Sequence, residues 1–289
     1  MKPMKRLARA LLPLFGAMLL CITASADSGP KDQLLVRVEK GPSEPYYLDL
    51  LEEGSAQDLH ETLEPEELAA LDPALLQRLL EAVPQGWHAC LAQGVSGPPI
   101  HGSLTGEAGE HLFRYYGVPD TYRILLVTAS GEVFLSPVCT RRVLQSSVTV
   151  DWPGRSVHVP PVWIGYVLQF FSTLLPTLLI EGLLLFLFGY GRQKRERQWF
   201  LAVNLLTQGL LAAVIAVQTL RHGVSGWTML PFLGMEAVIT VLETAIYPRV
   251  LRSHGTLRPV LYGVTANLAS ALLGLYLVGP VWRAIVSIS

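Results

Sequence analysis

The chain has 289 residues, of which 51% are hydrophobic and only 16% charged, and its formal net charge is −1. Ordinary soluble domains carry about 25% charged residues. The apolar excess lies almost entirely after position 160, so two regions in different solvents are expected. The small net charge gives no reason to expect nucleic acid or another strongly charged partner.

The first 26 residues have the features of a cleaved export signal. Four basic residues precede a short apolar stretch over residues 10–22, and Ala24, Ser25 and Ala26 fit an A-x-A cleavage site. The mature chain is then expected to begin at Asp27. The alternative is an uncleaved anchor helix, although this apolar stretch is short for about 30 Å of hydrocarbon. Both interpretations place the following domain outside the cytoplasm.

Residues 27–158 are expected to form a small extracytoplasmic β-rich domain. Short runs rich in β-branched and aromatic residues, such as residues 122–128, are typical of strands. In the first half of this region, Asp72 and Pro73 predict the start of a helix that runs to Val83. We therefore predict a β-sandwich with a helical insertion, followed by a helical membrane region, which gives an α+β fold class.

Two cysteines of this domain predict a disulfide. Exported chains meet oxidants, so Cys90 and Cys139 are expected to be bonded, and they lack the C-x-x-C spacing of a reactive thiol pair. The histidines at positions 88, 101 and 111 lack any H-E-x-x-H or comparable spacing and are expected to be solvated loop residues. We predict no metal, no cofactor and no catalytic residues here, and a binding or sensing module is the interpretation that remains.

Residues 159–289 predict a membrane domain of four helices. Each of its apolar stretches has roughly 20 residues, which is enough to span a bilayer. Basic residues crowd the first and third connections, and the positive-inside rule places these in the cytoplasm. The exported domain and the C-terminus then lie outside a cell membrane that the chain crosses several times. The four stretches cover about residues 162–188, 199–219, 227–247 and 260–281.

A carboxyl in one apolar stretch recurs with an amide in the next. Glu181 precedes Asn204 by 23 positions, and Glu243 precedes Asn267 by 24 positions. Each glutamate lies on a helix that enters the cytoplasm and each asparagine on the helix that returns. This order predicts two parallel hairpin repeats, related by an axis along the membrane normal. At about 1.5 Å per residue, all four side chains lie at a similar depth.

Two further polar residues extend this layer toward the bilayer centre. Gln208 shares a helix face with Asn204, and Glu236 shares one with Glu243. A charge at the middle of a membrane helix costs about 2.5–3.5 kcal/mol, so the carboxyls are expected to face the bundle interior. Two interpretations stay open. The layer joins helices through hydrogen bonds worth about 0.6–2 kcal/mol each, or it binds a cation, a proton or a polar substrate group. Three acids without a basic partner slightly favour binding.

Three motifs carry a resemblance to a known group of proteins. The segments TLLIEG at residues 177–182, FGYGR at 188–192 and VNLLT at 203–207 resemble uncharacterised multi-pass membrane proteins of Gram-positive anaerobes. The resemblance covers roughly the last 120 residues. It implies a membrane architecture and a bacterial origin, and it implies no particular activity.

The function predicted from these patterns is that of a non-enzymatic envelope protein. It would be a sensing, binding or scaffold protein. Its external domain would be coupled to an acidic site inside a helix bundle. Its expected partners are the lipid bilayer and a second copy or another membrane protein. The alternative is a unit that translocates an ion or small solute as an oligomer. An intramembrane enzyme is less favoured, because the apolar stretches contain no Ser/His pairing, no H-E-x-x-H and no paired Asp motif.

Overall fold

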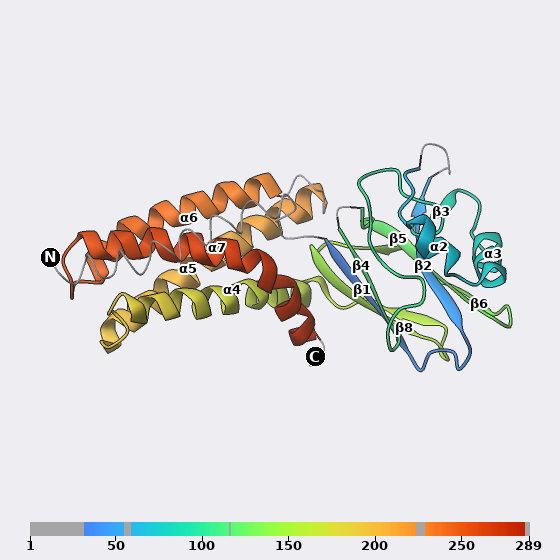
Figure 1. Cartoon of the computed structure of the whole chain (residues 1–289), viewed down its shortest axis with the longest axis horizontal. Coiled ribbons are helices and arrows are strands. Elements are labelled where there is room, and N and C mark those ends of the chain that lie inside the picture. Colours follow the sequence, from blue (N-terminus) through green and yellow to red (C-terminus); the bar gives the residue numbers. More distant parts are fainter. Residues whose placement is uncertain (1–31, 55–58, 116, 224–228, 287–289) are drawn as a thin grey trace. The chain divides into compact units, whose positions relative to one another are not determined.

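The computed structural model describes residues 32–54, 59–115, 117–223 and 229–286 (Figure 1). The predicted export signal lies outside the described residues. The chain forms two compact units: residues 32–167 and 216–223 belong to one, and residues 168–215 and 229–286 to the other. One unit is β-rich and the other is helical, which confirms the α+β class.

The β-rich unit is built from short strands, as its β-branched and aromatic runs predict. The strands in the described residues are β1 (Gln33–Glu39), β2 (Tyr46–Glu53), β3 (Trp87–Ala89), β4 (Glu110–Arg114), β5 (Thr121–Thr128), β6 (Val133–Leu135), β7 (Cys139–Thr140), β8 (Gln145–Asp151) and β9 (Ser156–His158). They form two sheets. One has the order β4-β1-β8-β9, and the other has the order β3-β2-β5-β6, with β7 also paired to β5.

The core of this unit lies between the two sheets. Val36 of β1 and Val148 of β8 are paired in the parallel ladder of the first sheet and are fully buried. Leu48 of β2 and Leu126 of β5 are paired in the antiparallel ladder of the second sheet and belong to the same apolar cluster. Side chains alternate between the faces of a strand, so each sheet contributes one apolar face to a shared core.

A helical insertion follows β2 and contains α2 (Pro65–Ala69) and α3 (Pro73–Glu81). The carboxylate of Asp72 caps α3 by accepting from the backbone N–H groups of Ala74 and Leu75, at 2.8 and 3.3 Å. Leu75 and Leu79 are buried in the core. The predicted start of this helix is therefore confirmed, while its end lies at Glu81 rather than at Val83.

The two cysteines are free thiols in the structure, so the predicted disulfide is wrong. The Cys90 N–H donates to the Leu50 carbonyl on β2 at 2.8 Å, whereas Cys139 begins β7, which pairs with β5. Two strands, β2 and β5, therefore separate the cysteines. Neighbouring strands are about 4.8 Å apart, and a disulfide needs Cα atoms within about 7 Å. Sheet order, which the cysteine spacing does not reveal, keeps the two thiols apart.

The prediction of solvated histidines is also wrong for two of the three. His88 lies in β3 and His111 in β4, and both side chains are buried. The His111 ring lies between the Ser103 carbonyl, 3.3 Å from Nδ1, and the Tyr46 hydroxyl, 3.2 Å from Nε2. Burial lowers the pKa of His111 to about 4, so this ring is neutral at physiological pH.

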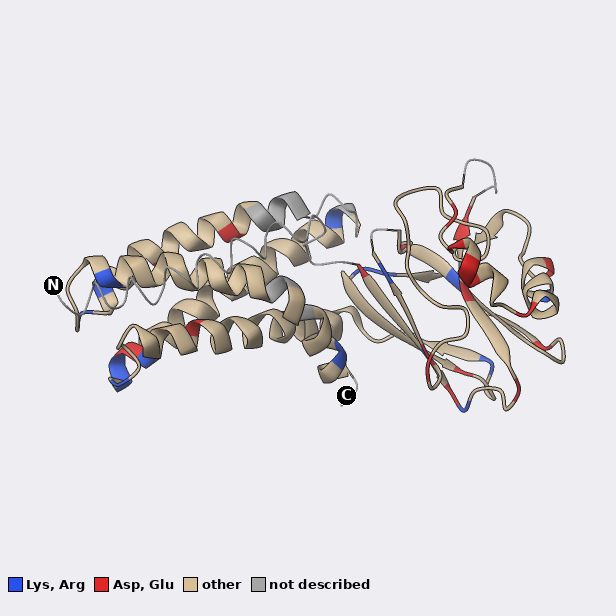
Figure 2. Cartoon of the chain, in the orientation of Figure 1, with Lys and Arg blue, Asp and Glu red and all other residues tan. Residues whose placement is uncertain are grey.

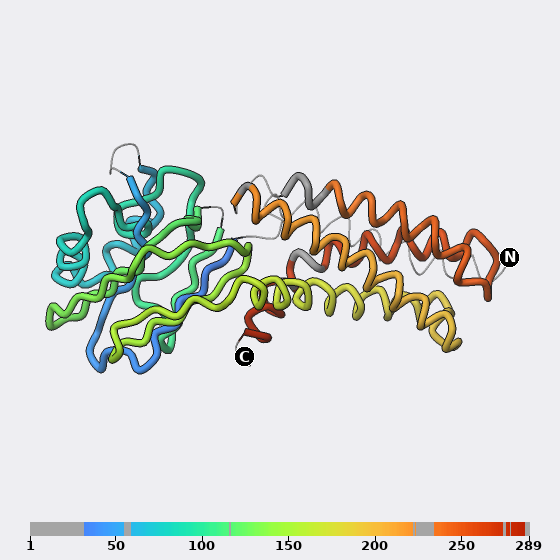
Figure 3. Tube along the Cα trace, turned by 180° about the vertical axis from the view of Figure 1, so that it is seen from behind, coloured from blue at the N-terminus to red at the C-terminus, as the bar shows by residue number. Residues whose placement is uncertain are grey.

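The helical unit contains four long helices that run side by side in both views (Figures 1 and 3). They are α4 (Val162–Leu187), α5 (Lys194–His222), α6 (Met229–Val250) and α7 (Leu257–Val286). Of the described residues, two helices, α4 and the part of α5 up to Arg221, are long and apolar enough to cross a membrane. That test concerns length and composition alone.

The apolar core of the helical unit draws on all four helices. Leu185 of α4, Val203 of α5, Tyr247 of α6 and Ala266 of α7 belong to one buried cluster. Lysine and arginine gather at the helix ends, while the ribbons between are mostly uncharged (Figure 2). The few acidic residues inside the helices are therefore the exceptions that define the site.

Candidate functional site

Glu243 of α6 is the most completely hydrogen-bonded acid of the helical unit, and 1% of it is exposed. Its Oε1 accepts from the Thr207 hydroxyl of α5 at 2.7 Å. Its Oε2 accepts from Asn267 Nδ2 of α7 at 2.9 Å and from the Tyr247 hydroxyl of its own helix at 3.2 Å. A carboxylate only accepts hydrogen bonds, so donors from three helices are the partners that an ionised Glu243 requires.

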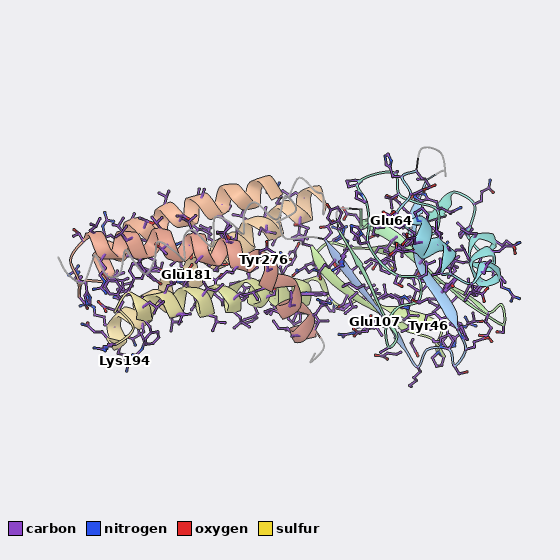
Figure 4. All side chains as sticks on the ribbon, in the orientation of Figure 1. Tyr46, Glu64, Glu107, Glu181, Lys194 and Tyr276 are labelled. Atoms are coloured by element: carbon purple, nitrogen blue, oxygen red, sulfur yellow. The ribbon has the colours of Figure 1, made fainter. Side chains whose placement is uncertain are left out.

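Glu181 of α4 is equally buried but has fewer partners. Its Oε1 accepts from the Ser270 hydroxyl of α7 at 2.8 Å. The Tyr262 hydroxyl of α7 donates to the backbone carbonyl of Glu181 at 3.2 Å. This bond joins α7 to α4 and gives the Glu181 carboxyl no donor. The second oxygen, Oε2, is buried and has no donor among the described residues. Figure 4 labels Glu181 among the helices and Lys194 at the beginning of α5.

Asn204 of α5 lies beside the Glu181 carboxyl and is fully buried. Its Nδ2 donates to the Tyr247 hydroxyl at 3.1 Å and to the Phe200 carbonyl at 3.2 Å. Its Oδ1 has no donor among the described residues. A buried acceptor without a donor costs about 1–3 kcal/mol. Two neighbouring side chains, Glu181 and Asn204, therefore each leave one acceptor oxygen unsatisfied.

The partners of the two acids follow one pattern. Each glutamate lies against the asparagine of its own hairpin, Asn204 for Glu181 and Asn267 for Glu243. Each also accepts from a hydroxyl of the other hairpin. That hydroxyl lies three positions after the asparagine in both cases, since Thr207 follows Asn204 and Ser270 follows Asn267. The two hairpins thus exchange equivalent hydrogen bonds across the bundle.

Of the six residues predicted for the polar layer, four come together, namely Glu181, Asn204, Glu243 and Asn267. Gln208 is buried one turn beyond Asn204, and Glu236 is partly buried two turns before Glu243. The Glu236 carbonyl accepts from the Thr240 hydroxyl at 2.8 Å. Within the parts of the chain that the structure describes, Gln208 and Glu236 take no part in the hydrogen bonds that join the other four.

The sequence interpretation missed three members of this site, Thr207, Tyr247 and Ser270. Each lies three or four positions after a predicted site residue, so each shares that residue's helix face. Helical spacing from the Glu and Asn residues could have found all three. Ser, Thr and Tyr residues are common in these four helices, however, and nothing local marks these three among them.

The unsatisfied oxygens limit what this site can hold. Among the described residues, no group of three or more His, Cys, Asp or Glu side chains is arranged to hold a metal ion. Glu181 Oε2 and Asn204 Oδ1 supply two free oxygens, whereas Ca²⁺ takes six to eight oxygen ligands. A proton needs only one donor and one acceptor. The arrangement therefore fits a proton better than a cation bound by protein oxygens alone.

Comparison with protein-family models, with curated proteins and with solved structures gave no match. The resemblance to multi-pass membrane proteins of Gram-positive anaerobes therefore stays a prediction.

Proposed function

We propose that this chain is a non-enzymatic multi-pass envelope protein, with an exported sensing or binding domain and a proton-binding site inside a four-helix transmembrane bundle. The observation that carries the proposal is the pair of buried oxygens, Glu181 Oε2 and Asn204 Oδ1, that lack donors. The two candidate spans and the basic helix ends support the membrane placement.

One proton satisfies both oxygens. Bound to Glu181 Oε2, it makes the carboxyl a donor, and the Asn204 side chain, which lies beside that carboxyl, has an unsatisfied acceptor in its Oδ1. Glu243 can stay ionised at the same time, because three neutral donors hydrogen-bond its two carboxylate oxygens. The two acids of the layer then have different roles: Glu243 holds helices together, and Glu181 takes up and releases the proton.

The test is thermal unfolding of the purified full-length protein in detergent, across pH and with added Na⁺, K⁺ or Ca²⁺. A ligand that binds only the folded state raises its stability by mass action. We expect acidification to stabilise the wild type relative to Glu181→Gln, since glutamine cannot take up the proton. Glu107→Gln makes the same chemical change at an exposed position of the β-rich unit and is the matched control.

The control variant should keep the wild-type pH response. If Glu181→Gln also keeps it, Glu181 binds no proton and the layer only joins helices. If one of the cations stabilises the wild type and not Glu181→Gln, while pH has no such effect, the ligand is that cation.

A second candidate function is translocation of an ion or small solute by an oligomer. The observation in its favour is the exchange of equivalent hydrogen bonds between the two hairpins, which supports a parallel repeat like those of some transporters. Reconstituted protein should then carry protons across liposome membranes, and Glu181→Gln should abolish that flux. A sensing or scaffold protein should show no flux above empty liposomes.

A further inference from the structure

A second polar cluster lies at the turns that end the helices, outside the acidic layer. Gly189 and Tyr190 lie between α4 and α5, and His254 lies between α6 and α7. A Cβ on Gly189 would lie 3.2 Å from Arg258 Nη2 and 3.5 Å from His254 Nε2, so the two side chains meet at this glycine. The rings of Tyr190 and His254 pack edge to face, with centroids 5.3 Å apart.

Glu196 brings a negative charge to the same cluster. Its Oε1 accepts from the backbone N–H of Ser253, at 3.2 Å, and from the Ser253 hydroxyl. The charges of Arg258 and Glu196 both act on the Tyr190 phenol, in opposite directions. Burial raises the pKa of Tyr190 to about 12, so its hydroxyl keeps its proton and is a donor at neutral pH.

Three buried polar atoms of this cluster have no partner among the described residues. Two belong to donors, the Tyr190 hydroxyl and Arg258 Nε, and one is an acceptor, Glu196 Oε2. Tyr190 is fully buried and Glu196 is 3% exposed, whereas His254 is exposed. The cluster therefore combines unsatisfied groups of both kinds with an open side.

We propose that this cluster binds a phosphodiester headgroup that carries an ammonium group, as in phosphatidylethanolamine. The phosphate would be held by Arg258, His254 and the Tyr190 hydroxyl, and the ammonium by Glu196 Oε2. A ligand that carries both an anionic and a cationic group would give partners to the buried donors and to the buried acceptor of this cluster. The inference rests on the proposed membrane placement of the helices, because their basic ends then lie at headgroup depth.

The chemistry of each group matches its part of such a headgroup. A guanidinium suits phosphate oxygens, which it can bind through two parallel N–H groups. The neutral phenol adds one donor. The second oxygen of Glu196 can accept from a primary ammonium, which has N–H groups to donate. Phosphatidylglycerol has the same phosphodiester without the ammonium, and it would leave Glu196 Oε2 unsatisfied.

The test uses full-length protein in a maltoside detergent, titrated with dihexanoyl phosphatidylethanolamine, dihexanoyl phosphatidylglycerol or inorganic phosphate. The midpoint of thermal unfolding reports binding. We expect phosphatidylethanolamine to raise the midpoint most. Tyr190→Phe keeps the ring packing and removes only the hydroxyl, and it should raise the half-saturating concentration about tenfold, the effect of one lost hydrogen bond. Glu196→Gln should abolish the preference over phosphatidylglycerol.

Arg252→Gln is the matched control. This arginine lies in the same turn and is exposed, and its Nε donates to the Arg249 carbonyl at 2.8 Å. The control should bind like the wild type. Equal responses to both lipids, or to inorganic phosphate alone, would overturn the assignment of the ammonium. No response to any probe, or an unchanged response in Tyr190→Phe, would overturn the site itself. The pH response of Glu181 is measured separately and stays intact in either case.

Discussion

Ser270 donates its hydroxyl to Glu181 at 2.8 Å, one turn beyond the Asn267 amide that donates to Glu243 at 2.9 Å. A single face of α7 therefore binds the acids of both α4 and α6. These contacts place the two carboxyls in one polar layer and make α7 the helix on which that layer depends.

Ser270→Ala should destabilise the helical unit by about 1–3 kcal/mol, because it leaves Glu181 Oε1 buried without a donor. Reversible unfolding in mixed micelles measures the loss. In a double-mutant cycle with Glu181→Gln, the two effects should be non-additive, as expected for side chains in direct contact. Additive effects would mean that the hydroxyl and the carboxyl do not interact in solution.

His111 should make the β-rich unit sensitive to acid. Burial lowers its pKa to about 4 from an ordinary value near 6.5. The neutral ring is therefore favoured in the folded state. Its contribution to the free energy of unfolding is fully present above pH 6.5 and is lost as pH falls through 4. The loss is roughly 3 kcal/mol.

The measurement is an NMR titration of the His111 imidazole, with urea unfolding at several pH values. Burial also raises the pKa of Asp49 to about 7. The folded state therefore binds this proton more tightly than the unfolded state and loses stability as pH rises from about 4 to 7. This effect on stability is opposite in sign to that of His111. The wild type is therefore compared with His111→Gln, which keeps Asp49. An imidazole that titrates near pH 6.5 would contradict the prediction.

Cys90 and Cys139 should be found as free thiols. Both are buried, and burial raises the pKa of each, so the reactive thiolate is scarce in the folded protein. Reaction of Cys90 and Cys139 with a maleimide should be slow under native conditions and should go to completion at both thiols in denaturant, as measured by mass spectrometry of their peptides. A mass two hydrogens lower, with no reaction before reduction, would show that the chain is cross-linked.

The topology predicts which engineered cysteines a membrane-impermeant maleimide can reach. Gln193→Cys and Thr256→Cys lie in the first and third helix connections and should react only after the cells are permeabilised. Glu107→Cys lies in the β-rich unit, which the proposed topology places outside the cytoplasm, and should react in intact cells. The native thiols are buried and give a low background. Reaction of position 193 in intact cells would reverse the proposed orientation.

Much of the polar layer could be predicted from the sequence, because a carboxyl or amide in an apolar helix is costly and therefore conspicuous. The spacing between Glu243 and Asn267 placed them on facing helices, and they are hydrogen-bonded. The hydroxyl partners Thr207 and Ser270 were not found. A hydroxyl can bond to a carbonyl of its own helix, so burying it costs less free energy than burying a carboxyl, and many hydroxyls occur in these helices.

In the β-rich unit, local patterns predicted strands and the cap of α3 at Asp72. The order of the strands depends on contacts between distant segments, such as the parallel pairing of β1 with β8, and alternation along a strand does not reveal it. The misassigned disulfide between Cys90 and Cys139 and the unexpected burial of His111 both follow from this order.

Glu181 and Glu243 have different roles in the proposed site, and their glutamine variants test this difference directly through reversible unfolding at neutral pH. Glu243→Gln puts an N–H group among three donors and should cost about 1–3 kcal/mol. Glu181→Gln resembles the protonated acid and can donate to Asn204 Oδ1, so it should leave stability unchanged or raise it. A loss for Glu181→Gln as large as that for Glu243→Gln would contradict the account.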